Sequence, residues 1–201
     1  MAPGRSRLTH APGIGMSLPA VVEDARRRAD AAGFTFSSEP AVGALLSCLA
    51  ASVPTDGRIL ELGTGAGCGL AWLIHGLGER SDVEVETIDL DDALQAQTRS
   101  ARWPPYVRFR LGDAVTLLPA LGMFDLIFAD APGGKTTGLG QTIAALRPGG
   151  TLMVDDMDVA RHEDADLRHA LTEVRRHLLT DERLVCSELA FSSGVIMAVR
   201  R

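Results

Sequence analysis

The sequence predicts a single α/β domain with a doubly wound, mostly parallel sheet of seven strands that ends in an antiparallel hairpin. From residue 58 onward, short apolar segments with a strand pattern alternate with segments of helical period. This alternation is typical of a parallel sheet that carries helices on both faces. The last two strand-like segments flank Ser-Ser-Gly at 192–194, and so short a turn joins only antiparallel strands.

Each element of the predicted core, residues 57–201, follows from its own pattern. The expected strands are apolar or alternate with a period of two: 58–62, 83–89, 106–111, 124–130 and 151–156, then two within 183–201. The expected helices have apolar residues at helical spacing: 68–78, 91–102, 113–121, 138–147 and 163–179. Pro-Gly-Gly at 148–150 is expected to end the fourth helix.

Residues 17–56 predict two helices ahead of the sheet, with Ser17 as the N-cap of the first and Pro19 in its first turn. Residues 1–16 predict a disordered leader. Their arginines precede no apolar segment, so they do not form a Sec-type signal peptide. Translation from Met1 and translation from Met16 both stay open.

The composition of the chain limits the kinds of partner that we expect and indicates where in the cell the protein is expected. A net charge of −6 argues against binding nucleic acid through its phosphates. No apolar run approaches the ~20 residues that a membrane span needs. The three cysteines are far apart, which fits a reducing, cytoplasmic compartment, and Cys48 is expected to be a buried thiol. A small-molecule substrate is therefore expected, and a homodimer is an open alternative to a monomer.

A glycine-rich loop follows the first predicted strand, in the stretch ILELGTGAGCG at 59–69. Ligands of open α/β sheets bind where the strands end, and glycines there let a ligand lie against bare backbone. Asp89 ends the second strand, where a carboxylate accepts hydrogen bonds from both hydroxyls of a ribose. The sequence therefore predicts a cofactor that contains adenosine.

The spacing of the glycines discriminates between cofactors. The dinucleotide fingerprint requires a small third residue, but Cys68 or Leu70 stands there, whereas E-x-G-x-G-x-G fits 61–67 without a gap. On this motif the chain resembles the class I methyltransferases that use S-adenosylmethionine (SAM) on a Rossmann-like sheet. The resemblance implies that Glu61 helps hold the methionine end of SAM, that Asp89 binds its ribose and that Asp113 lies near its adenine. The implied cofactor-binding residues are Glu61, Gly63, Thr64, Gly65, Gly67, Asp89, Asp113, Ala114 and Asp130.

Three carboxylates are expected to meet at the same edge of the sheet. Asp130 ends the fourth strand, and Asp155 and Asp156 end the fifth. Together they would repel one another unless they are protonated, hydrogen-bonded or bridged by a cation. Oxygen ligands suit Mg²⁺, Mn²⁺ or Ca²⁺. The alternative for Asp155 and Asp156 is a helix cap with a hydrogen bond to a neighbouring loop.

The stretches FDLIFADA (124–131) and LRPGGTLMVDDM (146–157) resemble motifs of the small cation-dependent O-methyltransferases, the group of the catechol and caffeoyl-CoA enzymes. The resemblance implies that Asp130, Asp155 and Asp156 bind a divalent cation, which in turn binds two neighbouring oxygens of the substrate. It also implies a last strand that lies antiparallel between the fifth and sixth strands. The chain departs from the family where Asp156 replaces Asn and where the lysine follows Asp130 by five residues instead of three.

Lys135 is the one lysine of the chain. A phosphate-binding P-loop requires a glycine where Ala129 stands, so GGKTT at 133–137 does not form one. A lysine acts as a general base only when its pKa is lowered, and the nearby Asp130 would raise that pKa unless a cation neutralised the carboxylate. We therefore expect Asp130 to be catalytic, whereas Lys135 is a base only beside a metal and otherwise binds an anionic substrate group or is solvated.

The predicted function is methyl transfer from SAM to a hydroxyl of a small molecule, assisted by a divalent cation. The loop 131–137 and the N-terminal helices are expected to build the substrate pocket, and His162 is expected on a solvated face. Two other classes stay open: a nicotinamide-dependent oxidoreductase on a similar sheet, and a SAM-binding protein without catalytic activity.

Overall fold

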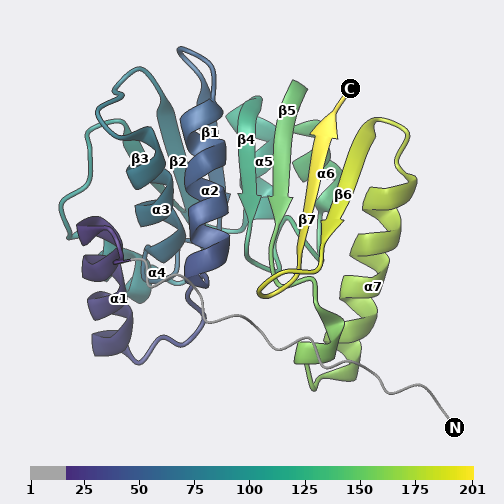
Figure 1. The fold of residues 1–201 in the computed structure, drawn as a ribbon, viewed down its shortest axis with the longest axis horizontal. Helices are drawn as coiled ribbons and strands as arrows, with labels where there is room; N and C mark the ends of the chain where they lie inside the picture. The colour runs from purple at the N-terminus through teal and green to yellow at the C-terminus, as the bar shows by residue number, and fades with distance from the viewer. Residues whose placement is uncertain (1–16) are drawn as a thin grey trace, which may run out of the picture.

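The computed structural model describes residues 17–201, and the predicted leader at 1–16 lies outside this range. A sheet of seven strands runs through the molecule, with helices on both of its faces (Figure 1). The strands are β1 (Arg58–Leu62), β2 (Glu84–Asp89), β3 (Val107–Leu111), β4 (Phe124–Ala129), β5 (Leu146–Val154), β6 (Leu184–Leu189) and β7 (Val195–Arg200).

The order of the strands is β3-β2-β1-β4-β5-β7-β6. Strands β1 to β5 pair in parallel, whereas β7 lies antiparallel between β5 and β6. The predicted fold class and the predicted place of the last strand are both confirmed. The chain reverses its direction of progress across the sheet between β1 and β4, which is where open α/β sheets form a ligand site.

Two hydrophobic cores hold the helices against the sheet. The first lies between one face and helices α1, α2 and α3, and the second lies between the other face and α5, α6 and α7. No helix within residues 17–201 is both long and apolar enough to cross a membrane. The helices are α1 (Ala20–Ala32), α2 (Pro40–Ser52), α3 (Cys68–Leu77), α4 (Asp92–Arg99), α5 (Ala114–Leu121), α6 (Leu139–Ala144), η1 (Val159–Arg161) and α7 (Ala165–Thr180).

The boundary between the fourth core helix and the fifth strand differs from the prediction. The helix was expected to reach residue 147, but α6 ends at Ala144 and β5 already begins at Leu146. Leu146 is fully buried and pairs with Phe124, and a register shift follows before the regular pairing from Thr151 onward. Pro-Gly-Gly therefore lies within an irregular part of the strand. At its other end β5 stops at Val154, so Asp155 and Asp156 follow the strand.

Two predictions about the N-terminal helices are wrong. Pro19 occupies the N-cap position of α1, with no side-chain cap, so Ser17 lies outside the helix. Cys48 is exposed instead of buried. Its neighbour Ser47 faces α3 and donates a hydrogen bond to the carbonyl oxygen of Trp72 at 2.7 Å, and the next residue of a helix is turned about 100° away from that contact.

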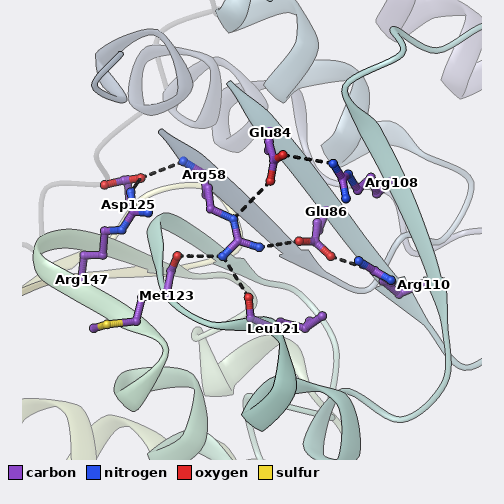
Figure 2. A network of polar contacts seen from close by, with 9 residues as sticks. All are labelled: Arg58, Glu84, Glu86, Arg108, Arg110, Leu121, Met123, Asp125 and Arg147. Atoms are coloured by element: carbon purple, nitrogen blue, oxygen red, sulfur yellow. Dashed lines mark hydrogen bonds and ion pairs between the residues drawn. The ribbon is translucent and has the colours of Figure 1, made fainter. Parts of the chain in front are cut away.

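An ionic network at the amino ends of the strands fixes β1 between β2 and β4 (Figure 2). The Arg58 guanidinium donates to Glu86 at 2.6 Å and to the carbonyl oxygens of Leu121 and Met123 at 2.9 and 3.1 Å. The other oxygen of Glu86 accepts from Arg110 at 2.8 Å. Because the Glu86 side chain is only 2% exposed, each of its oxygens needs one of these arginines.

We predict that Glu86→Ala lowers the free energy of unfolding by about 3 kcal/mol, since it leaves the half-buried Arg58 with only the exposed Glu84 at 3.4 Å as a carboxylate partner. Chemical denaturation followed by circular dichroism measures this change. Glu84→Ala is the matched control, because its carboxylate belongs to the same network but is 46% exposed, and it should cost less than about 1 kcal/mol. Equal losses for the two variants would contradict the role given to the buried carboxylate.

Candidate active site

A cavity of about 570 Å³ opens at the edge where the parallel strands end. The arrowheads of β4 and β5 in Figure 1 point toward this edge, and the segment that joins α1 to α2 passes along it. Most of the wall comes from five segments: the segment between α1 and α2, the loop after β1, the end of β2, the segment after β3 and the loop after β4. Asp156 and His162 extend the wall beyond β5.

The loop after β1 brings bare backbone to the cavity. Gly63, Thr64 and Gly65 line it, and the N–H groups of the first two donate to the carbonyl oxygen of Ile88 at 2.9 and 3.2 Å. Gly65 has a φ of 51°, and a Cβ there would lie 2.8 Å from the Phe34 ring. The loop therefore has no room for a side chain at Gly65, and its backbone stays open to a ligand.

Asp89 lies at the end of β2 with its carboxylate fixed by the backbone. One oxygen accepts from the N–H of Gly65 at 2.7 Å, and the other accepts from the N–H of Asp91 at 2.9 Å. Each carboxylate oxygen has a further lone pair, and Asp89 lines the cavity. Its position therefore allows both oxygens to accept from the two hydroxyls of a ribose.

Glu61 lies beneath the glycine loop and outside the cavity wall. Its side chain is buried, and Oε2 accepts from the Thr87 hydroxyl at 2.5 Å, whereas Oε1 has no partner within residues 17–201. Burial raises the pKa of this carboxyl well above its ordinary value, and the charges of Asp130 and Asp89 act in the same direction. Since an unpartnered buried acceptor is costly, a donor from a bound ligand would be stabilising here.

Two further predicted cofactor-binding residues, besides Glu61, lie outside the cavity wall. Gly67 is the N-cap of α3, where a Cβ would lie 2.8 Å from the Thr98 methyl carbon, so its small size allows α3 and α4 to pack closely. Asp113 is exposed and caps α5 by accepting from the N–H of Val115 at 3.0 Å. Its neighbour Ala114 does line the cavity.

Asp130 lies at the end of β4 and lines the cavity beside the segment that follows α1. One of its carboxylate oxygens accepts a hydrogen bond from the Ser38 hydroxyl at 3.3 Å. Burial raises the pKa of Asp130 well above its ordinary value, Asp155 raises it further, and Lys135 opposes the shift. Asp130 therefore holds a proton more strongly than an exposed aspartate does, which suits a proton acceptor.

Asp155 and Asp156 have different surroundings although they are neighbours. Asp155 is buried outside the cavity wall, where its Oδ1 accepts from the Ser193 hydroxyl and from the N–H of Asp156. Asp156 has a φ of 58° and lines the cavity. Asp130 and Asp156 therefore line the cavity without Asp155, although both Asp155 and Asp156 lie close enough to raise the pKa of Asp130.

The residues expected to bind a metal were tested on this geometry. Within residues 17–201, no three His, Cys, Asp or Glu side chains form a group that could hold a metal ion. The reason is visible at Asp155, because one of its oxygens is already hydrogen-bonded to Ser193 and to the Asp156 backbone. The side chains as they lie do not fit a divalent cation, and no chemical step below is derived through one.

Lys135 is buried, with 6% of its surface exposed, and it still lines the cavity. Its ammonium donates to the backbone carbonyl oxygen of Asp155 at 3.2 Å. The expectation of a solvated loop residue is therefore wrong. The turn at residues 132–137 carries the lysine, and its ammonium reaches the backbone of the residue that follows β5.

Several cavity residues were not found from the sequence. Phe34 and Phe36 stack edge to face with their ring centroids 5.8 Å apart, and Phe36 is 82% exposed at the cavity. The segment GFTFSSEP at 33–40 has two phenylalanines among polar residues. Aromatic residues in loops often bind ligands, so this segment could have been predicted to line the site. His162 was expected on a solvated face, but it lines the cavity and its Nε2 lies 3.1 Å from the carbonyl oxygen of Asp156.

Comparison with known proteins shows which protein family contains similar sequences. A sequence-family profile described as "Methyltransferase domain" matches residues 60–157, which include the glycine loop, Asp89, Asp130 and the end of β5. A Mycolicibacterium smegmatis protein named "Putative O-methyltransferase" is 36% identical over 92% of this chain and 92% of its own length. A Mycobacterium tuberculosis protein named "Probable O-methyltransferase Rv1220c" is 33% identical over 98% of this chain and 92% of its own length.

Solved structures agree with the fold. The O-methyltransferase from Bacillus cereus, solved in complex with S-adenosylhomocysteine (SAH), superposes with a TM-score of 0.76 at 21% identity and covers 94% of each chain. The extent of the mycobacterial matches, together with a site built from the predicted SAM motif, shows that the chain belongs to the class I SAM-dependent O-methyltransferase family.

Proposed function

We propose that this protein transfers the methyl group of SAM to a hydroxyl of a small molecule at the cavity described above. One observation carries the proposal: the glycine loop with Asp89 and the polar residues Asp130, Lys135 and Asp156 line the same cavity. A cofactor held at the first end and an acceptor held at the second would meet at Asp130. This is the proximity that methyl transfer in line requires.

The cofactor half fits SAM on three features. Asp89 has oxygens available for ribose hydroxyls, and the glycines allow the cofactor to lie on the backbone. The buried, unpartnered oxygen of Glu61 provides an acceptor beneath that backbone. When bound, SAM supplies an electrophilic methyl group on a positively charged sulfur.

In the acceptor half, Asp130 receives the proton of the acceptor hydroxyl. A carboxylate with a raised pKa is a stronger base than an exposed aspartate, and it lies in the wall where the acceptor oxygen must approach. Phe36 offers an exposed ring at the mouth of the cavity, which favours an aromatic or otherwise planar acceptor. The homodimer and the cytoplasmic location stay predictions.

Calorimetry and a transfer assay test the proposal. SAH should bind the full-length protein, NAD should not, and radiolabelled methyl should pass from SAM to members of a panel of catechols, phenols and other hydroxyl compounds. Binding of NAD without SAH would instead identify an oxidoreductase. Binding of SAH without transfer to any acceptor would favour the SAM-binding protein that lacks catalysis.

We predict that Asp89→Ala weakens SAH binding about 10- to 100-fold, because two hydrogen bonds to the ribose and the anchor of Gly65 are lost together. Isothermal titration calorimetry gives the dissociation constants. Asp92→Ala is the control, since this aspartate lies in the first turn of α4 and is exposed. Similar dissociation constants for Asp89→Ala and the wild type would contradict the ribose assignment.

We predict that Glu61→Gln changes the pH dependence of stability in the absence of SAM. The pKa of Glu61 is higher in the folded than in the unfolded protein, so the wild type loses stability as pH rises from the unfolded pKa toward the folded one. The loss is at most about 1.4 kcal/mol per pH unit. Urea denaturation between pH 5 and 8 should show this slope for the wild type and a shallower one for Glu61→Gln, which should also bind SAH more weakly. Parallel slopes would show that Glu61 does not titrate in this window.

We predict that Asp130→Asn lowers kcat for methyl transfer about 10²- to 10⁴-fold, because the amide cannot accept the proton of the acceptor. SAH binding should stay nearly unchanged, which calorimetry checks beside the kinetic assay. Asp158→Asn is the matched control, since Asp158 only caps η1 and asparagine can also cap. A kcat for Asp130→Asn near that of the wild type would exclude Asp130 as the base.

A further inference from the structure

The loop between β4 and α6 places Lys135 by a set of hydrogen bonds of its own. The N–H groups of residues 135–137 all donate to the carbonyl oxygen of Pro132, at 3.0 to 3.2 Å. The buried Thr142 hydroxyl donates to the carbonyl oxygen of Gly134 at 2.7 Å, and Gly134 has a φ of 88°. The loop is therefore a compact turn, and the buried position of Lys135 is built into it.

The ammonium of Lys135 is only partly used by the protein. A lysine ammonium has three N–H donors, and one of them goes to the carbonyl oxygen of Asp155. Across residues 17–201 the structure gives the other two no partner, although the side chain is 94% buried and lines the cavity. Lysine is rarely buried to this degree without a partner, so these donors point to a ligand group.

The positive charge of Lys135 lies in a cavity whose wall also carries several acidic side chains. Asp89, Asp91, Asp130 and Asp156 line the cavity, and no second lysine and no arginine does so within the part of the chain that the structure describes. Asp155 lies directly beneath. The acceptor end of the cavity therefore has one fixed positive charge, and it comes from the loop after β4.

We propose, on the basis of the function above, that Lys135 takes the place of the divalent cation of the resembled family and that the protein methylates its acceptor without a metal. The acceptor O–H bond breaks, and its proton passes to Asp130. The oxygen then forms a bond to the methyl carbon as the C–S bond breaks, and the electron pair of that bond stays on sulfur in neutral SAH. The Lys135 ammonium donates a hydrogen bond to the acceptor oxygen and stabilises the negative charge that develops there.

The positions of Asp155 and Lys135 favour the lysine over a metal ion as the positive charge of the site. Asp155 lies outside the cavity wall, and its Oδ1 is held by Ser193 and the Asp156 backbone, so only its Oδ2 is left for a cation shared by the three aspartates. Such a cation would also have to lie beside the Lys135 ammonium, against which it would be repelled. A lysine differs from a metal in binding one or two oxygens as a point charge, without fixed coordination geometry.

Because the chain contains a single lysine, labelling with lysine ¹³C at Cε gives one NMR signal that reports on this site. Mn²⁺ added to the labelled wild type with SAH should leave that signal unbroadened. Methyl transfer should change less than about twofold after dialysis against EDTA. Selective broadening by Mn²⁺, or loss of transfer on chelation with recovery in Mg²⁺, would overturn the proposal.

Lys135→Met tests the charge directly, since it removes the ammonium while it keeps a similar length. The rate of transfer should fall about 100-fold in kcat, with SAH affinity and melting temperature close to those of the wild type. Thr137→Ala, an exposed side chain in the same loop, is the control. An unchanged kcat in Lys135→Met would overturn the proposal. If that variant does not fold, the Mn²⁺ and EDTA experiments on the wild type decide alone. The Mn²⁺ experiment requires no turnover. It therefore distinguishes a failure of this proposal from a failure of the proposed function.

Discussion

Buried carboxylates at both ends of the parallel sheet set the constraint on which the rest of the structure depends, because a carboxylate removed from water needs donors or cations. At the amino end, Glu86 is matched by Arg58 and Arg110. At the carboxyl end, Glu61 and Asp155 have only neutral donors, a threonine hydroxyl in one case and a serine hydroxyl with a backbone N–H in the other. The negative charge is therefore neutralised by arginines at the amino end of the sheet. At the carboxyl end, where the cavity opens, negative charge remains in excess.

The excess of negative charge has a chemical consequence at the carboxyl end. Burial and mutual repulsion raise the pKa values of Glu61, Asp130 and Asp155. The same field favours a positive charge in the cavity, such as the sulfonium of SAM or the ammonium of Lys135. In the proposed reaction the same acids thus serve both substrates: they attract the charged cofactor, and they include a carboxylate that is a stronger base than an exposed one.

The cofactor half of the site could be predicted from the sequence because it is nearly contiguous. The loop after β1 and the acid at the end of β2 belong to neighbouring strands, and the strand pattern together with the glycine spacing located both. Phe34, Phe36 and His162 were missed because they reach the cavity from segments outside this unit, through packing that no short motif encodes. The early start of β5 was missed for a related reason, since Leu146 joins the strand by pairing with Phe124, which lies far away in the chain.

The acceptor half depends on contacts between distant segments. Glu39, at the start of α2, is held by Arg161 of η1 at 2.5 Å and by the Ser192 hydroxyl of the β6–β7 turn. The preceding residue, Ser38, donates to Asp130. These contacts tie the segment that carries Phe34 and Phe36 to the far side of the sheet, directly above the proposed base. A change in any of the three segments would alter the shape of the acceptor site while the glycine loop and Asp89 stayed in place. The fold therefore separates the part of the cavity proposed to hold SAM from the part proposed to receive the acceptor, and the second part is shaped by residues 33–39, the Lys135 loop and the contact with η1.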